Sequence, residues 1–370
     1  MMFGKNIIVH FISRDPEDKF AAGYIDFFKL RMPEWEHHFF VRKSDVPLRI
    51  CNCDNVHEDN LLRIILNPDN RKLLHQCRKI IYSGIWASWK RRTFLILSGL
   101  TSKTYLHFWG GDFYSYRDIH YTLHYTLRHP RRSLNKLLQH SLIKMCAGTI
   151  NLINSDVEEL CRIFPNNTKH FVAPMMGSPR RKLNFAEIRQ KHSQSNHTHR
   201  IIIGNSATNT NQHMKIFHVL EHLKNENITI TCPLSYGSDD YRIEIIETGR
   251  KIFGRNFIPV TDFMSFEEYV NLLASCEAGI FNNNRQQAMG NISLLLRLGK
   301  KVYLREDTSM WKHYTQNMKY IVYPISELEN ITLHELVNFP PELAYNNIKI
   351  AEERANSNYA VEQWRKVFED

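Results

Sequence analysis

Short apolar strands alternate with helical segments along most of the chain, and this alternation restricts the fold more than any other feature of the sequence. In the first half, the pattern predicts strands at 6–12, 38–41, 79–82, 104–108, 149–153 and 170–173. In the second half, it predicts strands at 201–203, 228–232, 257–260, 278–281, 301–304 and 320–322. Because strands that alternate with helices form parallel sheets covered on both faces, we expect an α/β protein.

The helices between these strands are predicted from apolar spacing and from capping residues. Those of the first half are expected at 17–31, 86–97, 116–127 and 133–145, with one more that begins at a capping box of Ser155 and Glu158. Those of the second half are expected at 211–224, 239–253, 265–275, 289–298 and about 308–315. Asn209 or Asn211 is expected to cap the first of these.

A polar, basic stretch interrupts the alternation and divides the chain. It covers residues 177–199 and is nearly devoid of core residues, so we interpret it as a linker that contains one short helix. The chain has 370 residues, which is long for one domain. We therefore expect two doubly wound, Rossmann-like domains, 1–176 and 200–345, that face each other across a ligand-binding cleft at the carboxyl ends of their strands.

The tail, residues 346–370, is expected to form one more amphipathic helix over 348–368. One arrangement open to this helix is packing back on the N-terminal domain.

Composition and charge restrict the partners. The formal net charge is +10, which favours anionic partners: nucleic acid, acidic lipid head groups or nucleotides. Neither a GxGxxG nor a Walker A sequence occurs, and the seven cysteines lack zinc spacing, so we expect no cofactor and no metal. No secretory signal and no apolar run of about 20 residues is present, which favours a cytoplasmic protein.

Polar and glycine residues gather after three predicted strands of the second domain. They are Gly204, Asn205, Ser206 and Asn209 after the first strand, Ser235, Tyr236 and Gly237 after the second, and Arg285, Gln286, Gln287 and Gly290 after the fourth. A glycine turn at a helix N-terminus forms an anion cradle, and Arg285 precedes a second helix. Together they suit both phosphates of a nucleotide diphosphate that departs as the leaving group. The alternative is ordinary βα turns with a solvated arginine.

The first domain has a comparable loop, Trp109-Gly110-Gly111-Asp112-Phe113-Tyr114. Asp112 is a candidate general base for an acceptor hydroxyl. The alternative is a glycine turn of positive φ with Asp112 as a helix cap. The Asp239-Asp240 pair is interpreted as first-turn charge of a helix rather than as a metal site.

These motifs, together with Asn211-Gln212-His213, resemble glycosyltransferase family 56, which is often labelled 4-alpha-L-fucosyltransferase. The resemblance is strongest over 104–116 and 201–313. It implies a GT-B architecture with the donor on the C-terminal domain, the acceptor on the N-terminal domain and usually no metal. It also implies acceptor contacts at His10, Trp109, Gly110, Gly111 and Tyr114.

Three stretches depart from the family. The family has Gly-Ala-Asp where this chain has Gly110-Gly111-Asp112, and Gly-Ile-Gly where it has Ala288-Met289-Gly290. The residues after Asn205-Ser206 also differ, because Ala207-Thr208-Asn209-Thr210 carries no acid or base. These differences leave the assignment to the glycosyltransferase class unchanged, but they leave the identity of the donor sugar open.

The resemblance implies transfer of 4-acetamido-4,6-dideoxygalactose from dTDP to a polyprenyl-diphosphate-linked saccharide, in the synthesis of O-antigen or enterobacterial common antigen. A GT-B transferase with another donor nucleotide or a soluble acceptor remains open, as does a nucleotide-sugar-binding protein without activity. A basic nucleic-acid-binding protein is the alternative from another class. Because no helix-turn-helix or RNP motif occurs, we expect no nucleic-acid partner.

Basic residues next to apolar ones predict docking on an anionic membrane surface. Lys90-Arg91-Arg92 adjoins an apolar run. Arg128, Arg131 and Arg132 precede a helix that carries Lys136 and Lys144 beside Leu137, Leu138, Leu142 and Ile143. The alternative is a solvated basic face over core leucines. The first interpretation gives a cytoplasmic enzyme that associates peripherally with the inner membrane.

Overall fold

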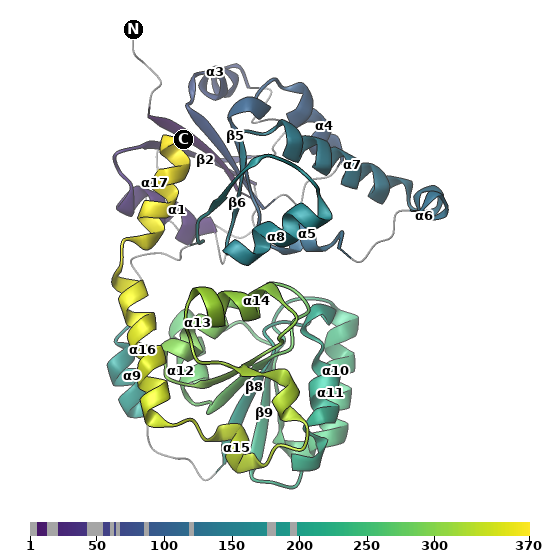
Figure 1. Cartoon of the computed structure of the whole chain (residues 1–370), viewed down its shortest axis with the longest axis vertical. Coiled ribbons are helices and arrows are strands. Elements are labelled where there is room, and N and C mark those ends of the chain that lie inside the picture. The colour runs from purple at the N-terminus through teal and green to yellow at the C-terminus, as the bar shows by residue number, and fades with distance from the viewer. Residues whose placement is uncertain are drawn as a thin grey trace. The chain divides into compact units, whose positions relative to one another are not determined.

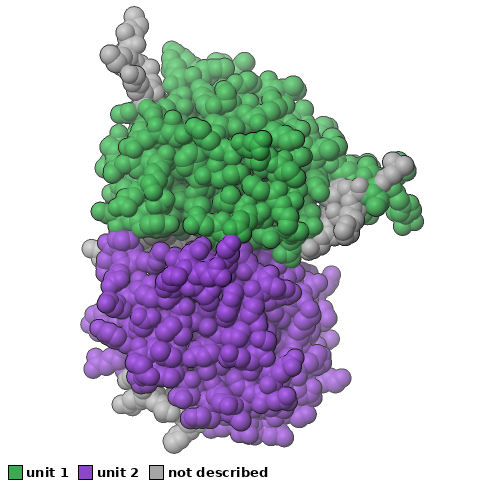
Figure 2. Space-filling view, viewed as in Figure 1, with its two compact units in different colours: residues 1–182, 358–370 green, residues 183–357 purple. Residues whose placement is uncertain are grey.

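The computed structural model describes residues 6–12, 21–42, 55–59, 63, 67–84, 89–117, 122–175, 183–192 and 198–370. The chain divides into two compact units (Figure 2). Unit 1 comprises Met1–Lys182 with Asn358–Asp370, and unit 2 comprises Leu183–Ser357. Each unit has its own parallel sheet (Figure 1).

Unit 1 contains a seven-stranded parallel sheet in the order β3-β2-β1-β4-β5-β6-β7. The strands are β1 (Ile7–Ile12), β2 (Glu36–Arg42), β3 (Val56–Asp59), β4 (Lys79–Ser83), β5 (Thr104–His107), β6 (Gly148–Asn151) and β7 (Lys169–Val172). β1 pairs with both β2 and β4. The chain therefore winds outwards in one direction from β1 and then in the other, which places the switch point of the topology between β1 and β4.

The sheet of unit 1 is covered on both faces. Its helices are α1 (Ala21–Arg31), α3 (Pro68–Gln76), α4 (Trp89–Leu97), α5 (Gly111–Tyr114), α6 (Leu123–Arg128), α7 (Pro130–Met145), α8 (Asn154–Ile163) and α17 (Tyr359–Glu369), with a 3-10 turn at Thr101–Lys103. Val9 packs into one buried apolar cluster, while its neighbour Ile8 packs into another with Phe28 and Trp364. Successive side chains of a strand point to opposite faces, so each face has its own core.

Unit 2 repeats this plan with six parallel strands in the order β10-β9-β8-β11-β12-β13. They are β8 (His199–Ile203), β9 (Ile228–Pro233), β10 (Phe257–Val260), β11 (Ala278–Phe281), β12 (Lys301–Leu304) and β13 (Tyr323–Pro324). Because β8 pairs with both β9 and β11, the switch point lies between β8 and β11.

The helices of unit 2 lie before, between and after its strands. They are α9 (Phe185–Lys191), α10 (His213–Val219), α11 (Asp239–Phe253), α12 (Phe266–Ala274), α13 (Met289–Arg297), α14 (Ser309–Lys312), α15 (Leu333–Val337) and α16 (Pro341–Asn356). Short 3-10 turns occur at Asn209–Asn211, Glu221–Leu223, Gly254–Asn256 and Ile325–Leu328, and a π turn at His313–Asn317.

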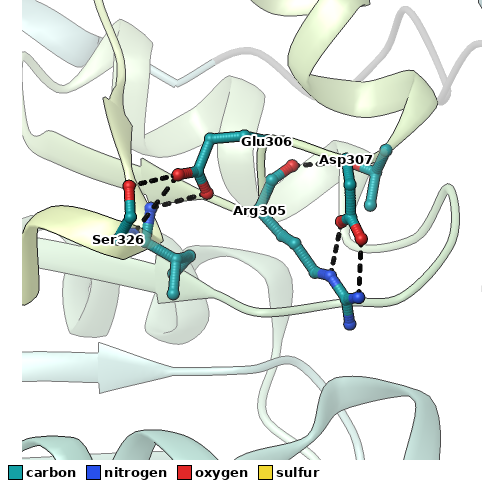
Figure 3. A network of polar contacts seen from close by, with 6 residues as sticks. Arg305, Glu306, Asp307 and Ser326 are labelled. Carbon is teal, nitrogen blue, oxygen red and sulfur yellow. Dashed lines mark hydrogen bonds and ion pairs between the residues drawn. The ribbon is translucent and has the colours of Figure 1, made fainter.

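Glu306 connects the loop after β12 to the segment after β13 through hydrogen bonds (Figure 3). Its carboxylate accepts hydrogen bonds from the backbone N–H groups of Ile325 and Ser326 at 3.2 and 3.4 Å, and from the Ser326 hydroxyl. Arg305 binds Asp307 in a bidentate pair, Nε to Oδ1 at 2.5 Å and Nη2 to Oδ2 at 2.7 Å. The short edge strand β13 is therefore held by side chains as well as by its ladder.

The two-sheet α/β fold predicted from the alternation is confirmed, and several element bounds match, including those of α11 and of β10, β11 and β12. The strand expected at 320–322 is wrong, because Tyr320 and Val322 are buried without pairing and β13 follows at Tyr323–Pro324. The tail forms two helices rather than one, because the helical conformation is interrupted at Ser357 and Asn358, between α16 and α17.

Three helix starts differ from expectation. The predicted capping box is wrong, because the N-cap of α8 is Ile153 and makes no side-chain cap bond. The helix expected over 116–127 reduces to α6, preceded by a turn at 115–117, with 118–121 outside the described residues. α10 begins after Gln212, whose φ is 54°, so neither Asn209 nor Asn211 caps it. The starts expected at 17 and 86 also lie outside the described residues.

Candidate functional site

A glycine turn ends β8 at the switch point of unit 2. Gly204 has φ of +69°, and a Cβ at this position would lie 2.4 Å from His213 Nε2 and 2.9 Å from Asn211 Oδ1. Both the backbone conformation and the space therefore require glycine. The backbone of the turn therefore packs directly against His213, the first residue of α10.

The side chain of Asn211 organises the loop that follows this turn. Its Oδ1 accepts the Asn205 backbone N–H at 3.0 Å and the Asn283 amide at 3.1 Å. Its Nδ2 donates to Ser206 Oγ at 3.2 Å and to Thr208 Oγ1 at 2.8 Å. Asn211 is 1% exposed, so these bonds form in a region of low dielectric, where a lost partner is costly.

Gln287 joins the loop after β11 to the same hydroxyls. Its Nε2 donates to Ser206 Oγ at 3.1 Å and to Thr208 Oγ1 at 3.0 Å, and its Oε1 accepts from Thr210 Oγ1 at 2.6 Å. The loops after β8 and β11 are neighbours because their strands pair at the switch point. Open α/β sheets bind ligands at this position.

The loop after β9 completes the cluster. Asn205 Nδ2 donates to the Tyr236 hydroxyl at 2.6 Å, and the Ala207 N–H donates to the Tyr236 carbonyl at 2.7 Å. A Cβ on Gly237 would lie 2.3 Å from the Ala207 carbonyl oxygen, so glycine permits this close approach. Ser235 precedes Tyr236 and is half-buried. The structure thus brings together all three loops that the sequence singled out in this domain.

Three amide oxygens of the cluster have no hydrogen-bond donor among the described residues. They are Asn205 Oδ1, Asn283 Oδ1 and Gln286 Oε1, and all three residues are buried. Buried polar atoms normally have a hydrogen-bond partner, so an orphaned one requires an explanation, such as a bound ligand, an ion or a water molecule. Amide oxygens accept hydrogen bonds, so their expected partners are hydroxyl or N–H groups.

The start of α13 contributes positive potential to this cluster. Its N-cap, Ala288, has φ of 59° and makes no side-chain cap bond, and a Cβ on Gly290 would meet nothing within 4 Å. Arg285 is half-buried, and its Nη1 donates to the Gln286 carbonyl at 2.8 Å. The first N–H groups of α13 and one guanidinium are suited to an anion here. Asn209 is exposed in the 3-10 turn before Gln212.

In unit 1, the loop after β5 makes a tight turn into α5. Gly110 has φ of +93°, and Gly111 begins α5. Asp112 is 2% exposed, and its two carboxylate oxygens lie 3.1 and 3.2 Å from the Trp109 backbone nitrogen, which donates to them. The Tyr114 hydroxyl donates to Asp156 Oδ1 at 2.7 Å. The positive-φ glycine turn of the alternative interpretation is present at Gly110, but Asp112 does not cap the helix, because Gly110 is the N-cap of α5 and no side chain makes a cap bond there.

A row of buried polar side chains crosses the sheet of unit 1, and no local sequence pattern indicates it. His37 Nε2 lies 3.1 Å from the Met32 carbonyl, His37 Nδ1 2.9 Å from His10 Nε2, and His10 Nδ1 3.0 Å from the Tyr24 hydroxyl. The Ser83 hydroxyl donates to Tyr24 at 3.3 Å and lies 2.9 Å from His107 Nδ1. His10 is thus in the core and not among the loop residues.

The donor and the acceptor of each hydrogen bond in this row can be assigned by starting from the Met32 carbonyl at one end and from the Ser83 hydroxyl near the other. The Met32 carbonyl only accepts, so His37 donates from Nε2 and accepts at Nδ1 from His10, which in turn accepts from Tyr24. Because Ser83 donates to Tyr24, it accepts from His107 Nδ1. His107 Nε2 is then a buried acceptor with no donor among the described residues. His107 ends β5, two residues before Trp109.

The Asp239-Asp240 pair supplies first-turn charge of α11. Ser238 is the N-cap, and Asp239 pairs with Arg242 at 2.6 Å. Among the described residues, no group of three or more His, Cys, Asp or Glu side chains is arranged to hold a metal ion. Within the same ranges, no helix is long and apolar enough to cross a membrane.

Several solved structures resemble this chain over nearly its whole length. A sucrose-phosphate synthase from Thermosynechococcus elongatus has a TM-score of 0.66 at 10% identity and covers 98% of this chain and 99% of its own. A glycosyltransferase from Rickettsia africae has a TM-score of 0.62 at 12% identity, with 98% and 97% covered. A trehalose-6-phosphate protein of E. coli bound with UDP-2-fluoro glucose has a TM-score of 0.62 at 9% identity, with 99% of both chains covered.

These likenesses define the fold as GT-B-like. The sequence pattern of the 4-alpha-L-fucosyltransferase family, glycosyl transferase group 56, matches residues 72–367. The match covers more than half of the chain, so the protein belongs to this family and is a glycosyltransferase.

Removing the Asn211 side chain should destabilise unit 2. In Asn211→Ala, the Asn205 N–H and the Asn283 amide lose their acceptor inside the core, which should lower the free energy of unfolding by about 2–4 kcal/mol. Urea unfolding measures the change. Asn225→Ala, at an exposed position, is the matched control and should stay within about 0.5 kcal/mol of wild type. Equal stabilities for the two variants would contradict the role of Asn211.

Acid should destabilise the protein through its buried histidines. Burial lowers the pKa of His107 to about 3 and those of His37, His213 and His313 to about 4. Below about pH 6.5, these histidines take up protons in the unfolded chain but not in the folded chain. The contribution of these histidines to the free energy of unfolding is therefore fully present above that pH and decreases as the pH falls towards their folded-state pKa values. Each histidine contributes a slope of up to about 1.4 kcal/mol per pH unit.

Unfolding free energies measured between pH 4 and pH 8 test this slope. His313→Gln should reduce it by one histidine's share, while His124→Gln, at an exposed position, should leave it unchanged. A free energy of unfolding that does not decrease between pH 7 and pH 5 would contradict the prediction.

Proposed function

We propose that this glycosyltransferase moves an amino-deoxy sugar from a dTDP-sugar to a polyprenyl-diphosphate-linked saccharide. 4-Acetamido-4,6-dideoxygalactose is the sugar that we propose, and the product enters O-antigen or common antigen synthesis. The observation that carries the donor part is the convergence of three polar loops at the switch point of unit 2, joined through Asn211 and Gln287. Family membership supports the class of reaction.

The proposed donor site assigns the diphosphate to the positive elements of the cluster. Arg285 and the first N–H groups of α13 face the leaving phosphates, and the backbone of the Gly204 turn, which packs against the start of α10, is assigned to the same site. Charge develops on the diphosphate as the bond to the sugar breaks, so these groups stabilise the transition state more than the bound donor. The orphaned oxygens of Asn205, Asn283 and Gln286 would accept bonds from the N–H and hydroxyl groups of the nucleoside and sugar.

The proposed acceptor site is the loop from Trp109 to Tyr114, with Asp112 as general base. Asp112 accepts the Trp109 N–H. A carboxylate offers about four lone-pair positions, so this bond does not by itself exclude a bond from an acceptor hydroxyl. Gly110 and Gly111 present little side-chain bulk beside it. His10 would act indirectly, because Tyr24 and Ser83 connect it to His107 at the start of this loop.

Substitutions at the two sites should separate turnover from donor binding. Asp112→Asn should lower kcat by about 10²–10⁴-fold with dTDP binding near normal, while Arg285→Ala should weaken dTDP binding. Asp239→Asn, an exposed carboxylate, is the matched control. Transfer is measured with radiolabelled donor, and binding by thermal unfolding, where dTDP at about 100 times its Kd adds about 2.7 kcal/mol.

Normal transfer by Asp112→Asn would remove Asp112 from the mechanism. Stabilisation by UDP or GDP instead of dTDP would favour the alternative of another donor nucleotide. Stabilisation by nucleic acid alone would contradict the proposed function.

We also propose that α6 and α7 dock on an anionic membrane, which makes the enzyme peripheral to the inner membrane. Leu127 and Leu137 are 72% and 64% exposed, and Arg128 and Arg131 are exposed beside them. Leu142 and Ile143 of the same helix are buried in the core. Arg92 does not belong to this surface, because it is buried and donates to Asn135 and Gln139; the side chains of Lys90 and Arg91 lie outside the described residues.

Removing two of these charges should weaken binding to anionic vesicles. Each basic residue near an anionic surface contributes about 1 kcal/mol, so Arg128→Gln/Arg131→Gln should bind about 30-fold more weakly. Vesicle sedimentation measures the change. Lys251→Gln/Arg255→Gln removes two exposed charges from unit 2 and is the control. Unchanged binding by the first pair would contradict the docking surface.

A further inference from the structure

A basic cavity lies at the amino-terminal edge of the sheet in unit 1. Its volume is about 460 Å³, and its lining consists of Arg78, Lys79, Ser102, Lys103, Tyr105, Ala147, Lys169 and Asp370. Lys79 and Lys169 are the first residues of β4 and β7, and Tyr105 is the second of β5. In a parallel sheet these positions lie at the edge opposite to the carboxyl ends. The cavity is therefore separate from the loop that carries Asp112.

The charges of this lining do not balance. It contains four cationic side chains and a single carboxylate, that of Asp370. Asp370 accepts from Lys169 Nζ through Oδ1 at 2.8 Å and from the Tyr105 hydroxyl through Oδ2 at 2.7 Å. Arg78 and Lys103 donate to backbone carbonyls, which carry no full charge. The side chains around this hollow therefore carry more positive than negative charge.

Lys79 is the most deeply placed of these cations. It is only 5% exposed, and its ammonium donates to the Tyr105 hydroxyl at 2.8 Å. No carboxylate accepts a hydrogen bond from it among the described residues. Burial lowers the pKa of Lys79 to about 8, and the nearby Asp370 partly opposes that shift. A buried ammonium without a direct counter-ion is costly, and an anion in the cavity would offset this cost.

We propose that this cavity binds a phosphate group, supplied by a free phosphate compound or by a lipid head group. Phosphate fits the lining better than a single carboxylate does, because its charge and its several terminal oxygens match donors that converge from three separate segments of chain, 78–79, 102–105 and 169. Lys79 and Lys169 are the principal cations, with Arg78 and Lys103 at the sides. Asp370 now occupies part of this space, so the phosphate competes with it and displaces the end of α17.

Titration of the full-length protein with inorganic phosphate tests the proposal. Carbon-13 labelling of the lysine ε positions follows each ammonium by NMR, and Lys79→Met assigns the signal of Lys79. Phosphate should shift the signals of Lys79, Lys103 and Lys169. Lys169→Gln should weaken binding about tenfold, and Asp370→Asn, which removes the competing charge, should strengthen it about tenfold. Lys366→Gln, an exposed lysine of α17, is the matched control and should change nothing.

Two further experiments distinguish a lipid head group from a free phosphate compound, and this cavity from the proposed donor site. Vesicles that contain phosphatidic acid should compete with phosphate if the cavity takes lipid head groups, and neutral vesicles should not; competition by a soluble phosphomonoester alone indicates a free ligand. Both results support a phosphate site. Lysine signals that do not move in wild type or in Asp370→Asn would overturn the proposal. So would a response that Lys169→Gln leaves intact and Arg285→Ala abolishes, because phosphate would then bind only at the proposed donor site.

Discussion

The hydrogen bonds of one buried side chain, Asn211, hold together the part of unit 2 on which the proposed chemistry depends. Asn211 fixes the backbone of the Gly204 turn through Asn205 and reaches the loop after β11 through Asn283. Ser206 and Thr208 extend the connection to Gln287. The strands at the switch point lead into loops that run in opposite directions. Side-chain bonds of this kind, together with the hydrogen bond from the Asn284 N–H to the Thr210 carbonyl at 3.0 Å, keep the two loops in one geometry.

The same constraint accounts for two of the four non-glycine residues with positive φ in the described part of the chain, the others being Lys319 and Asn330. Gln212 and Ala288 both have positive φ and are not glycine, and each stands at the N-cap of a helix that begins at this cluster. Left-handed conformations of this kind cost energy and persist where surrounding contacts enforce them. The family has glycine where this chain has Ala288, which agrees with the φ of 59° at that position. The polar cluster therefore determines how α10 and α13 begin.

The fold was largely predictable because strands buried on both faces leave a strong sequence signal. Runs such as Ile201–Ile203 are β-branched throughout, and the glycine and polar residues that follow them mark the carboxyl edge. β3 was missed because Val56–Asp59 contains two acidic residues and one histidine, which hide an edge strand. α3 was missed because Leu74 is the only buried residue among its nine.

The candidate site was predictable as a set of loops but not as a network. Gly204, Tyr236 and Gln287 could be named from their positions after strands, whereas the bond from Asn211 to Asn283 joins residues 72 apart, and no local pattern reports it. The buried row from His37 to His107 was hidden for a related reason. Its members are spread over four strands and one helix. A polar residue within a strand is normally expected to be exposed to solvent, and only the assembled sheet shows that these side chains are buried against one another.

Hydrogen–deuterium exchange with and without dTDP tests the central claim most directly, because it reports the donor site by position. The account predicts that dTDP slows exchange at the backbone amides of the Gly204 turn, of the Tyr236 loop and of the start of α13. Exchange elsewhere in the six-stranded sheet should change little. Protection that appears only outside these three segments, or none at saturating dTDP, would contradict the placement of the donor at the switch point of unit 2.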